Sequence, residues 1–225
     1  MLVLAGRLAR PSYPACTGPG SCEPGQICAR APLGDNTHCM PHVASGDAEA
    51  LRTFRAAQPS SAFGPSGCLA SWSDRTDPCD AWDGVQCCGP ASLPPLFLEP
   101  QTTRVCVLTL VNCGLVMADS IGELDYLLFF SFDQNAADRM PPLGRLINLV
   151  QVSMKGNSIR ELPVAVGQLN KLSTLDLSAN QLGDIPESVG NATALINLFL
   201  DGNRLRRLPQ SLAWRPGDAG TSLGC

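Results

Sequence analysis

The sequence has few of the features that mark nucleic-acid-binding or membrane-spanning proteins. Lysine and arginine number 16 against 20 aspartate and glutamate residues, so the formal net charge is −4. This balance offers no basic surface for nucleic acid or anionic lipid. No apolar run approaches the roughly 20 residues that a membrane-spanning helix needs. Hydrophobic residues still make up 44% of the chain, which indicates a globular protein.

Residues suited to catalysis are equally scarce. The only histidines, His38 and His42, lie in a cysteine-rich stretch, whereas a nucleophile system needs a base held by a scaffold. No glycine-rich phosphate-binding motif stands between an expected strand and a helix. Asp176 and Asp201 are candidates for a glycosidase pair, but their pattern favours solvated strand positions. The sequence therefore predicts a protein that is not an enzyme and that binds no cofactor.

Cysteine, by contrast, is abundant. Eight of the eleven cysteines fall between residues 16 and 88, where the apolar pattern is weakest. A segment that cannot bury a large core is commonly stapled by disulfides, which persist in oxidising compartments. This usage predicts the secretory pathway or the extracellular space. The leader, residues 1–15, nevertheless shows no clear signal peptide, because Arg7 and Arg10 interrupt its apolar stretch.

The cysteine-rich segment 16–46 admits two interpretations. A module with two disulfides is favoured, and its pairing is left open. A zinc site is the alternative because His38 and His42 flank a cysteine, but the cysteines are spaced more widely than zinc ligands usually are. We therefore expect no metal here. The four cysteines concerned are Cys16, Cys22, Cys28 and Cys39.

A repeat of 22 to 23 residues accounts for the second half of the chain. Segments starting at Leu149, Leu172 and Leu195 share apolar residues at offsets 0, 3, 5, 10 and 13, asparagine at offset 8 and proline at offset 14. Two earlier copies start at Val105 and Leu127. The five predicted repeats are 105–126, 127–148, 149–171, 172–194 and 195–212, and an irregular tail, 213–225, follows, where the chain looks truncated.

The start of each copy alternates apolar and polar residues, as a half-buried strand does. Copies of this length stack their strands in parallel, and about three are needed to bury one continuous core. At offset 8, an inward-pointing polar side chain can satisfy backbone groups that the bend after the strand exposes. This predicted ladder consists of Cys113, Asn135, Asn157, Asn180 and Asn203.

These offsets resemble the leucine-rich repeat consensus, and the phrase LDLSANQLGDIPESVGNATAL resembles plant extracellular repeats especially. The resemblance implies an α/β fold, a right-handed solenoid or horseshoe with short parallel strands on its concave face. Plant extracellular repeats usually run one residue longer before the Ile-Pro. The plain Leu-Pro of the neighbouring copies is similar to intracellular Ras-group repeats, so repeat subtype alone leaves an extracellular and a cytoplasmic location open.

Residues 47–88 resemble the N-terminal cap of plant receptor-like kinases and polygalacturonase inhibitors. The shared features are an acidic start, an apolar helical pattern and the final motif, which reads PCDAWDGVQC here. The resemblance implies a cap and linker over 47–104 that cover the apolar end of the first repeat. Its helix would carry the apolar residues Ala50, Leu51, Phe54 and Ala57.

Within this cap, Cys79 and Cys87 are close enough in sequence for a short disulfide. Adjacent cysteines project in different directions, so Cys88 needs another partner, for which Cys68 is the candidate. A cap of this kind is absent from Ras-group proteins, which favours the extracellular location.

Strand alternation also predicts which side chains point away from the core. Most are small or polar, whereas Phe129 and Phe199 are exposed aromatics of the kind that anchor interfaces. Lys155 lies among aspartates, a mixed-charge field that gives specificity. Outward positions also include Val107, Thr109, Val111 and Ser178, and the candidate ligand-binding residues are Phe129, Ser131, Asp133, Gln151, Ser153, Lys155, Thr174, Asp176, Asn197, Phe199 and Asp201.

Two functions are consistent with this pattern. The leading hypothesis is a secreted or cell-surface binding module, similar to a receptor ectodomain or an inhibitor, that takes a protein, peptide or polysaccharide on its concave face. The alternative is an intracellular signalling scaffold. Asn191-Ala192-Thr193 is an acceptor sequence for N-glycosylation in the outer part of the fourth repeat, with a helix-capping role for Asn191 as the alternative.

Overall fold

The computed structural model describes residues 45–65, 67–74, 76–88 and 103–212, together with the backbone of three short strands outside these ranges. Two of those strands, β1 (Gln26–Arg30) and β2 (Thr37–Pro41), pair antiparallel with each other. The side chains of Cys16, Cys22, Cys28 and Cys39 lie outside the described residues, so their pairing stays a prediction.

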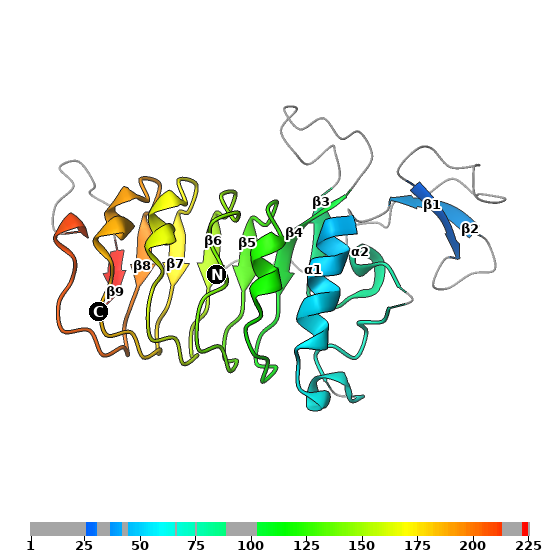
Figure 1. Cartoon of the computed structure of the whole chain (residues 1–225), viewed down its shortest axis with the longest axis horizontal. Coiled ribbons are helices and arrows are strands. Elements are labelled where there is room, and N and C mark those ends of the chain that lie inside the picture. Colours follow the sequence, from blue (N-terminus) through cyan, green and yellow to red (C-terminus); the bar gives the residue numbers. More distant parts are fainter. Residues whose placement is uncertain are drawn as a thin grey trace.

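A second, seven-stranded sheet runs through the rest of the chain in sequence order (Figure 1). The first pair, β3 with β4, is antiparallel, and every later pair is parallel. Each of the five predicted repeats contributes one strand, which the 22–23-residue period dictates. The strands are β3 (Val85–Cys88), β4 (Arg104–Thr109), β5 (Phe129–Ser131), β6 (Gln151–Ser153), β7 (Thr174–Asp176), β8 (Asn197–Phe199) and β9 (Ser222–Gly224).

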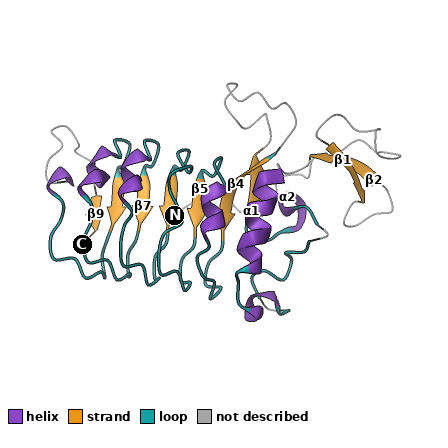
Figure 2. Cartoon of the chain, viewed as in Figure 1, coloured by secondary structure: helices purple, strands orange, loops and turns teal. Residues whose placement is uncertain are grey.

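Short 3-10 helices follow most of the strands (Figure 2). Pro163 and Pro186 come directly before two of them, where a fixed φ suits the start of a helix. The repeat that begins at Leu127 has turns in place of a 3-10 helix. The helices of the repeats are η2 (Asp119–Glu123), η3 (Val164–Gln168), η4 (Glu187–Asn191) and η5 (Gln210–Leu212).

Leucine and related side chains at the repeat offsets form one continuous core along the solenoid. Leu175, Leu177 and Leu198 have no exposed surface, and Leu200 is 3% exposed. Their burial confirms the strand alternation, because the same strands turn their intervening residues outward. The observed fold is thus the predicted leucine-rich repeat solenoid, with parallel strands along one face.

The cap covers the first repeat with helix α1 (Ser45–Ala56), the short helices η1 (Ser60–Phe63) and α2 (Pro78–Ala81), and strand β3. Leu51 and Phe54 of α1 are fully buried, as the helical spacing predicts. Ala57 is exposed instead, since the helix ends one residue earlier. Trp72 and Trp82 stack with ring centroids 4.5 Å apart and enlarge the buried cap.

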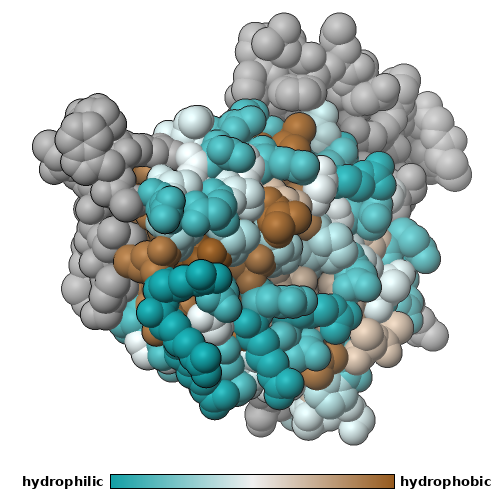
Figure 3. Space-filling view, turned by 60° about the vertical axis from the view of Figure 1, so that its left-hand side comes forward, coloured by the Kyte–Doolittle hydropathy of each residue, from teal (hydrophilic) through white to brown (hydrophobic). Residues whose placement is uncertain are grey.

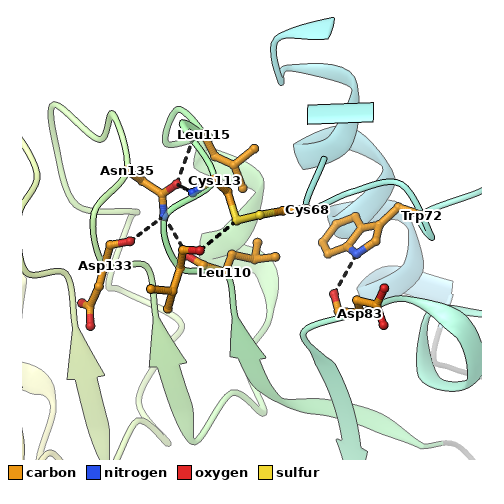
Figure 4. The surroundings of a disulfide bond; sticks show 9 residues. Cys68, Trp72, Asp83, Leu110, Cys113, Leu115, Asp133 and Asn135 are labelled. Carbon is orange, nitrogen blue, oxygen red and sulfur yellow. Dashed lines mark hydrogen bonds between the residues drawn. A yellow bond between two sulfur atoms is a disulfide. The ribbon is translucent and has the colours of Figure 1, made fainter. Parts of the chain in front are cut away.

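Three disulfides lie in the described part of the chain, all at the cap and first repeat. Cys79 is joined to Cys87, the pair expected from the sequence. The candidate pair of Cys68 with Cys88 is wrong. Cys68 is bonded to Cys113 in the first repeat (Figure 4), and Cys88 is bonded to Cys106 in the neighbouring strand β4.

These two bridges connect the cap to the repeats, a proximity that only folding creates. Cys113 therefore does not extend the ladder of polar side chains, because its sulfur is used in the bridge. The tail also differs from the expectation of an irregular segment. Its residues Ser222–Gly224 form β9, which pairs in parallel with β8 and adds a strand to the sheet.

Candidate binding surface on the strand face

Outward-pointing side chains of the strands line up in rows across the sheet, because the parallel strands pair in register. We define a first row as Val107, Phe129, Gln151, Thr174 and Asn197, and a second row as Thr109, Ser131, Ser153, Asp176 and Phe199. Two residues further along each repeat, the third row is Val111, Asp133, Lys155, Ser178 and Asp201. Together the three rows form the strand face, which contains every predicted ligand-binding residue.

The end of the strand face next to the cap is apolar. Phe129 and Val111 are each 42% exposed, and Val107 between the cap and Phe129 is half-buried. Val111 has the same exposure as Phe129, although it is not among the ligand-binding residues predicted from the sequence. Its position two residues beyond strand β4, in the third row, is the signal that identifies it.

The opposite end of the strand face differs from the expectation in two ways. Phe199 is only half-buried, so it presents less surface than Phe129. Ser178 is 2% exposed, not outward-facing, because its hydroxyl donates to Asp176 Oδ1 at 2.6 Å. Asn197 is also half-buried, and its amide donates to Thr174 Oγ1 at 3.3 Å.

Two carboxylates of the strand face are held in place by hydrogen bonds. Asp133 Oδ1 accepts the Ser153 hydroxyl at 2.6 Å and the Lys155 backbone N–H at 2.9 Å, both from the next repeat. Asp176 Oδ1 accepts the hydroxyl and, at 2.9 Å, the backbone N–H of Ser178. Hydrogen bonds to a carboxylate fix its geometry, so both groups present a preorganised negative charge.

Two other charges of the third row are free to meet a ligand. Within the part of the chain that the structure describes, no ion pair or hydrogen bond engages the Lys155 ammonium group or the Asp201 carboxylate. Both residues are exposed. From the cap outward, the strand face thus carries the Phe129 ring, the fixed carboxylate of Asp133, the free cation of Lys155, the fixed carboxylate of Asp176 and the free anion of Asp201.

The asparagine ladder stabilises the backbone beneath the strand face by hydrogen bonds. Asn157 Oδ1 accepts the Ala137 N–H at 3.0 Å, and its amide donates to the carbonyls of Phe132 and Met154 at 2.8 and 3.0 Å. Asn135, Asn180 and Asn203 make equivalent bonds between neighbouring repeats. These bonds fix the bend after each strand, and with it the third row.

A buried ion pair fixes the cap against the first strand of the repeats. Asp47, with no exposed surface, accepts two hydrogen bonds from Arg104 at 3.0 and 2.9 Å and one from the Val105 N–H at 2.8 Å. Arg104 also pairs with Asp125 and lies 4.0 Å from the centroid of the Tyr126 ring. The sequence pattern indicates only an acidic residue at the start of the cap, because the partner of Asp47 lies 57 residues away.

Two carboxyl groups with shifted pKa values lie away from the strand face. Burial, and after it the charge of Asp77, raises the pKa of Asp80 in α2 to about 6. The backbone N–H groups of Ser211 and Gln210 donate to Glu187 and lower its pKa. Neither shift concerns a residue of the three rows.

Two clefts accompany the last repeats, and the first of them touches the strand face at Asp201. One of about 310 Å³ borders the final coil and includes Asp201, Leu205 and Arg206. Another of about 670 Å³ lies along the Leu-Pro segments, with Glu161 and Arg207 on its rim. The strand face itself is thus an open surface, of the shape that suits a macromolecular or extended ligand more than an enclosed small molecule.

Among the described residues, no cluster of histidine, cysteine and acidic side chains has the arrangement of a metal site. In the same part of the chain, no helix has the length and hydrophobicity to cross a membrane. Figure 3, in which the C-terminal side comes forward, shows a largely hydrophilic surface interrupted by small hydrophobic patches.

Comparison with known proteins places this geometry in a defined class of capped solenoids. Residues 44–88 match the family model "Leucine rich repeat N-terminal domain", and residues 171–192 match "Leucine Rich Repeat". A comparison of the sequence with curated proteins gives no significant match.

Several solved structures of plant ectodomains share the fold. The BIR3–SERK2 complex of Arabidopsis thaliana aligns at 24% identity over 78% of this chain and 90% of that chain, with a TM-score of 0.60. The ectodomain of the receptor kinase SOBIR1 from the same plant aligns at 22% identity over 73% and 83%, with a TM-score of 0.57. The PEPR1–AtPEP1 structure aligns at 23% identity over 80% and 24%, with a TM-score of 0.60.

At these identities the likeness concerns the fold. Taken with the two family segments, the register of the strands and the asparagine ladder, it gives this chain the fold of a leucine-rich repeat solenoid with an N-terminal cap, similar to that of the plant ectodomains.

Proposed function

We propose that this protein is an extracellular, non-catalytic binding module whose strand face takes a protein or peptide partner. The observation that carries the proposal is the open strand face, which combines the exposed Phe129 ring, two fixed carboxylates and the free charges of Lys155 and Asp201. One similar structure is the BIR3–SERK2 complex and another is PEPR1–AtPEP1, which supports a partner-binding role here.

The apolar end supplies the affinity of such an interface. Covering apolar surface contributes roughly 25 cal/mol per Å², and a well-packed aromatic side chain is a frequent energetic centre of interfaces. Phe129 lies in the first row and Val111 in the third, with the second row between them, so they offer a partner two separate apolar contacts. This favours a protein or peptide over a polysaccharide, which offers fewer apolar groups.

The charges of the third row supply orientation. Lys155 would pair with an acidic group, and Asp201, two strands further on, with a basic one. Charges fixed at an interface select partners and registers more than they add affinity. The ligand that fits is therefore a segment with an apolar, an acidic and a basic side chain arranged from the cap outward.

The disulfides support the extracellular location. Three bridges in the cap and first repeat join six cysteines in the described residues, and such bridges persist in oxidising compartments. An intracellular scaffold would carry the same cysteines as thiols. Alkylation of protein isolated from its own source, without reductant, distinguishes the two. Modification of these six residues would contradict the extracellular assignment.

Selection of a displayed random-peptide library on the folded protein tests the binding face. For the selected peptides, Phe129→Ala and Lys155→Glu should each weaken binding by about tenfold or more. Val164→Ala is the matched control, because Val164 is 73% exposed but lies in η3, outside the strand rows. Peptides that lose affinity only for the control variant would contradict the proposal, and exclusive binding to an arrayed polysaccharide would replace the peptide with a glycan ligand.

A further inference from the structure

The fourth repeat contains the one Asn-x-Ser/Thr sequence of the chain, Asn191-Ala192-Thr193. This is the acceptor sequence for N-linked glycans, provided that the middle residue is not proline. A sequence of three residues recurs by chance, so its meaning depends on what the asparagine does in the folded protein.

Asn191 does not serve as a helix N-cap, which is the structural role that would otherwise explain an asparagine here. Asparagine is favoured as the N-cap of a helix. Asn191 is the last residue of η4, whose N-cap is Pro186 and whose C-cap is Ala192. Within the described residues its side-chain amide makes no hydrogen bond, whereas each asparagine of the ladder bonds three or more backbone groups.

Asn191 is also accessible. It is exposed, and residues at the equivalent position of the earlier repeats are polar and exposed as well: Glu123, Arg145 and Gln168. Glu123 and Arg145 form an ion pair at the surface. This column of the solenoid therefore tolerates large hydrated groups without disturbing the core.

The site lies on the far side of the core from the strand face. Val189 of η4 and Leu198 of β8 are buried in the same core, which therefore separates the helix from the outward side of the strand. A glycan at the end of η4 would extend from the outer surface and leave the three rows open.

We infer that Asn191 is a glycosylation site, which carries an N-linked oligosaccharide on the outer surface of the fourth repeat. The inference rests on the extracellular location in the proposed function, because the oligosaccharide is transferred only in the secretory pathway. A glycan at this position leaves the strand face accessible, which is compatible with the binding surface proposed above.

Mass spectrometry of the protein from its own source tests the inference. The peptide that contains Asn191 should carry the mass of a glycan, and enzymatic release in heavy-oxygen water should leave labelled aspartate at position 191. When the chain is expressed with a secretion leader, Asn191→Gln and Thr193→Ala should lose the glycan completely. Thr193→Ser, which keeps the hydroxyl group, should retain it, and Asn170→Gln is the control outside an acceptor sequence.

An unmodified Asn191 in the source protein would overturn the inference. The state of the six bridged cysteines in the same sample separates the two failures. With the disulfides intact, only the glycosylation site would be wrong, whereas free thiols would show that the extracellular location is wrong too.

Discussion

The N-terminal cap and the repeat region differ in the contacts that hold their chain segments together. All three described disulfides and the buried Asp47–Arg104 pair lie in the cap or at its junction with the first repeat. From the second repeat onward, the described residues rely on stacked leucines and on the asparagine ladder.

The sequence periods explain this difference. A regular repeat satisfies its neighbour with the same contacts each time, so a small set of residue types is enough. The cap joins segments that have no common period, and it must also close the apolar end of the first repeat. In the cap, covalent bridges and a buried ion pair fix the chain segments relative to one another, whereas in the repeats the recurring contacts do so.

The largest expected effect on stability comes from removing a disulfide of the cap. Loss of the Cys68–Cys113 bridge, which closes a loop of 45 residues, should lower the free energy of unfolding by about 4 kcal/mol when both cysteines are replaced by serine. The Cys79–Cys87 bridge spans 8 residues, and its loss should cost about 2.5 kcal/mol. Urea unfolding measures both values, and an equal or larger loss for the shorter loop would argue against this account.

The stacked core is the noncovalent counterpart. Leu177→Ala should destabilise the protein by about 3 kcal/mol, because Leu177 has no exposed surface and the truncation leaves a cavity in the core. Val164→Ala, at an exposed position of the same solenoid, should change stability by less than about 0.5 kcal/mol. Thermal and urea unfolding of both variants check the contrast, and comparable losses would mean that the strand alternation is wrong.

The ladder is expected to contribute less than the core. Asn157→Ala removes the partner of one backbone N–H and two buried carbonyls, at a cost of about 2 kcal/mol. Asn197→Ala, which loses one 3.3 Å bond between half-buried side chains, should have almost no effect. Hydrogen exchange should locate the loss of protection around the second and third repeats. Unchanged hydrogen exchange in these repeats would show that the ladder does not stabilise them.

The smallest effect is a pH dependence confined to the cap. The pKa of Asp80 is about 6 in the folded state, above its ordinary value of 3.8, so the folded state favours the protonated acid. This contribution is present below about pH 4 and is lost as the pH rises through about 6. Asp80 is exposed, so after screening by solvent the change is on the order of 1 kcal/mol.

Replacement of this acid isolates the effect. Asp80→Asn should raise stability at pH 7 and flatten the dependence between pH 4 and 6, whereas Asp201→Asn on the exposed strand face should leave it unchanged. Stability measured by urea unfolding across this range checks the assignment. If the free energy of unfolding still changed with pH in Asp80→Asn, another titrating group would be responsible for the pH dependence.

The sequence predicts the repeats far better than the cap. Seven repeated offsets are enough to define the strands, the buried leucines and the asparagine ladder. The Cys68–Cys113 bridge and the Asp47–Arg104 pair escape prediction because their partners lie 45 and 57 residues apart, without a period that relates them. The burial of Ser178 escapes it for a different reason, since a short side chain on the strand face can turn back to a neighbouring carboxylate.

Photo-crosslinking with a selected peptide shows directly whether the partner binds the strand face. A benzophenone amino acid replaces Phe129 in one variant and Val164 in another, and the crosslinked sites are mapped by mass spectrometry. The account predicts crosslinks from position 129 and none from position 164. Crosslinks from position 164 alone would contradict it, because the ligand would then lie on the outer surface of the solenoid.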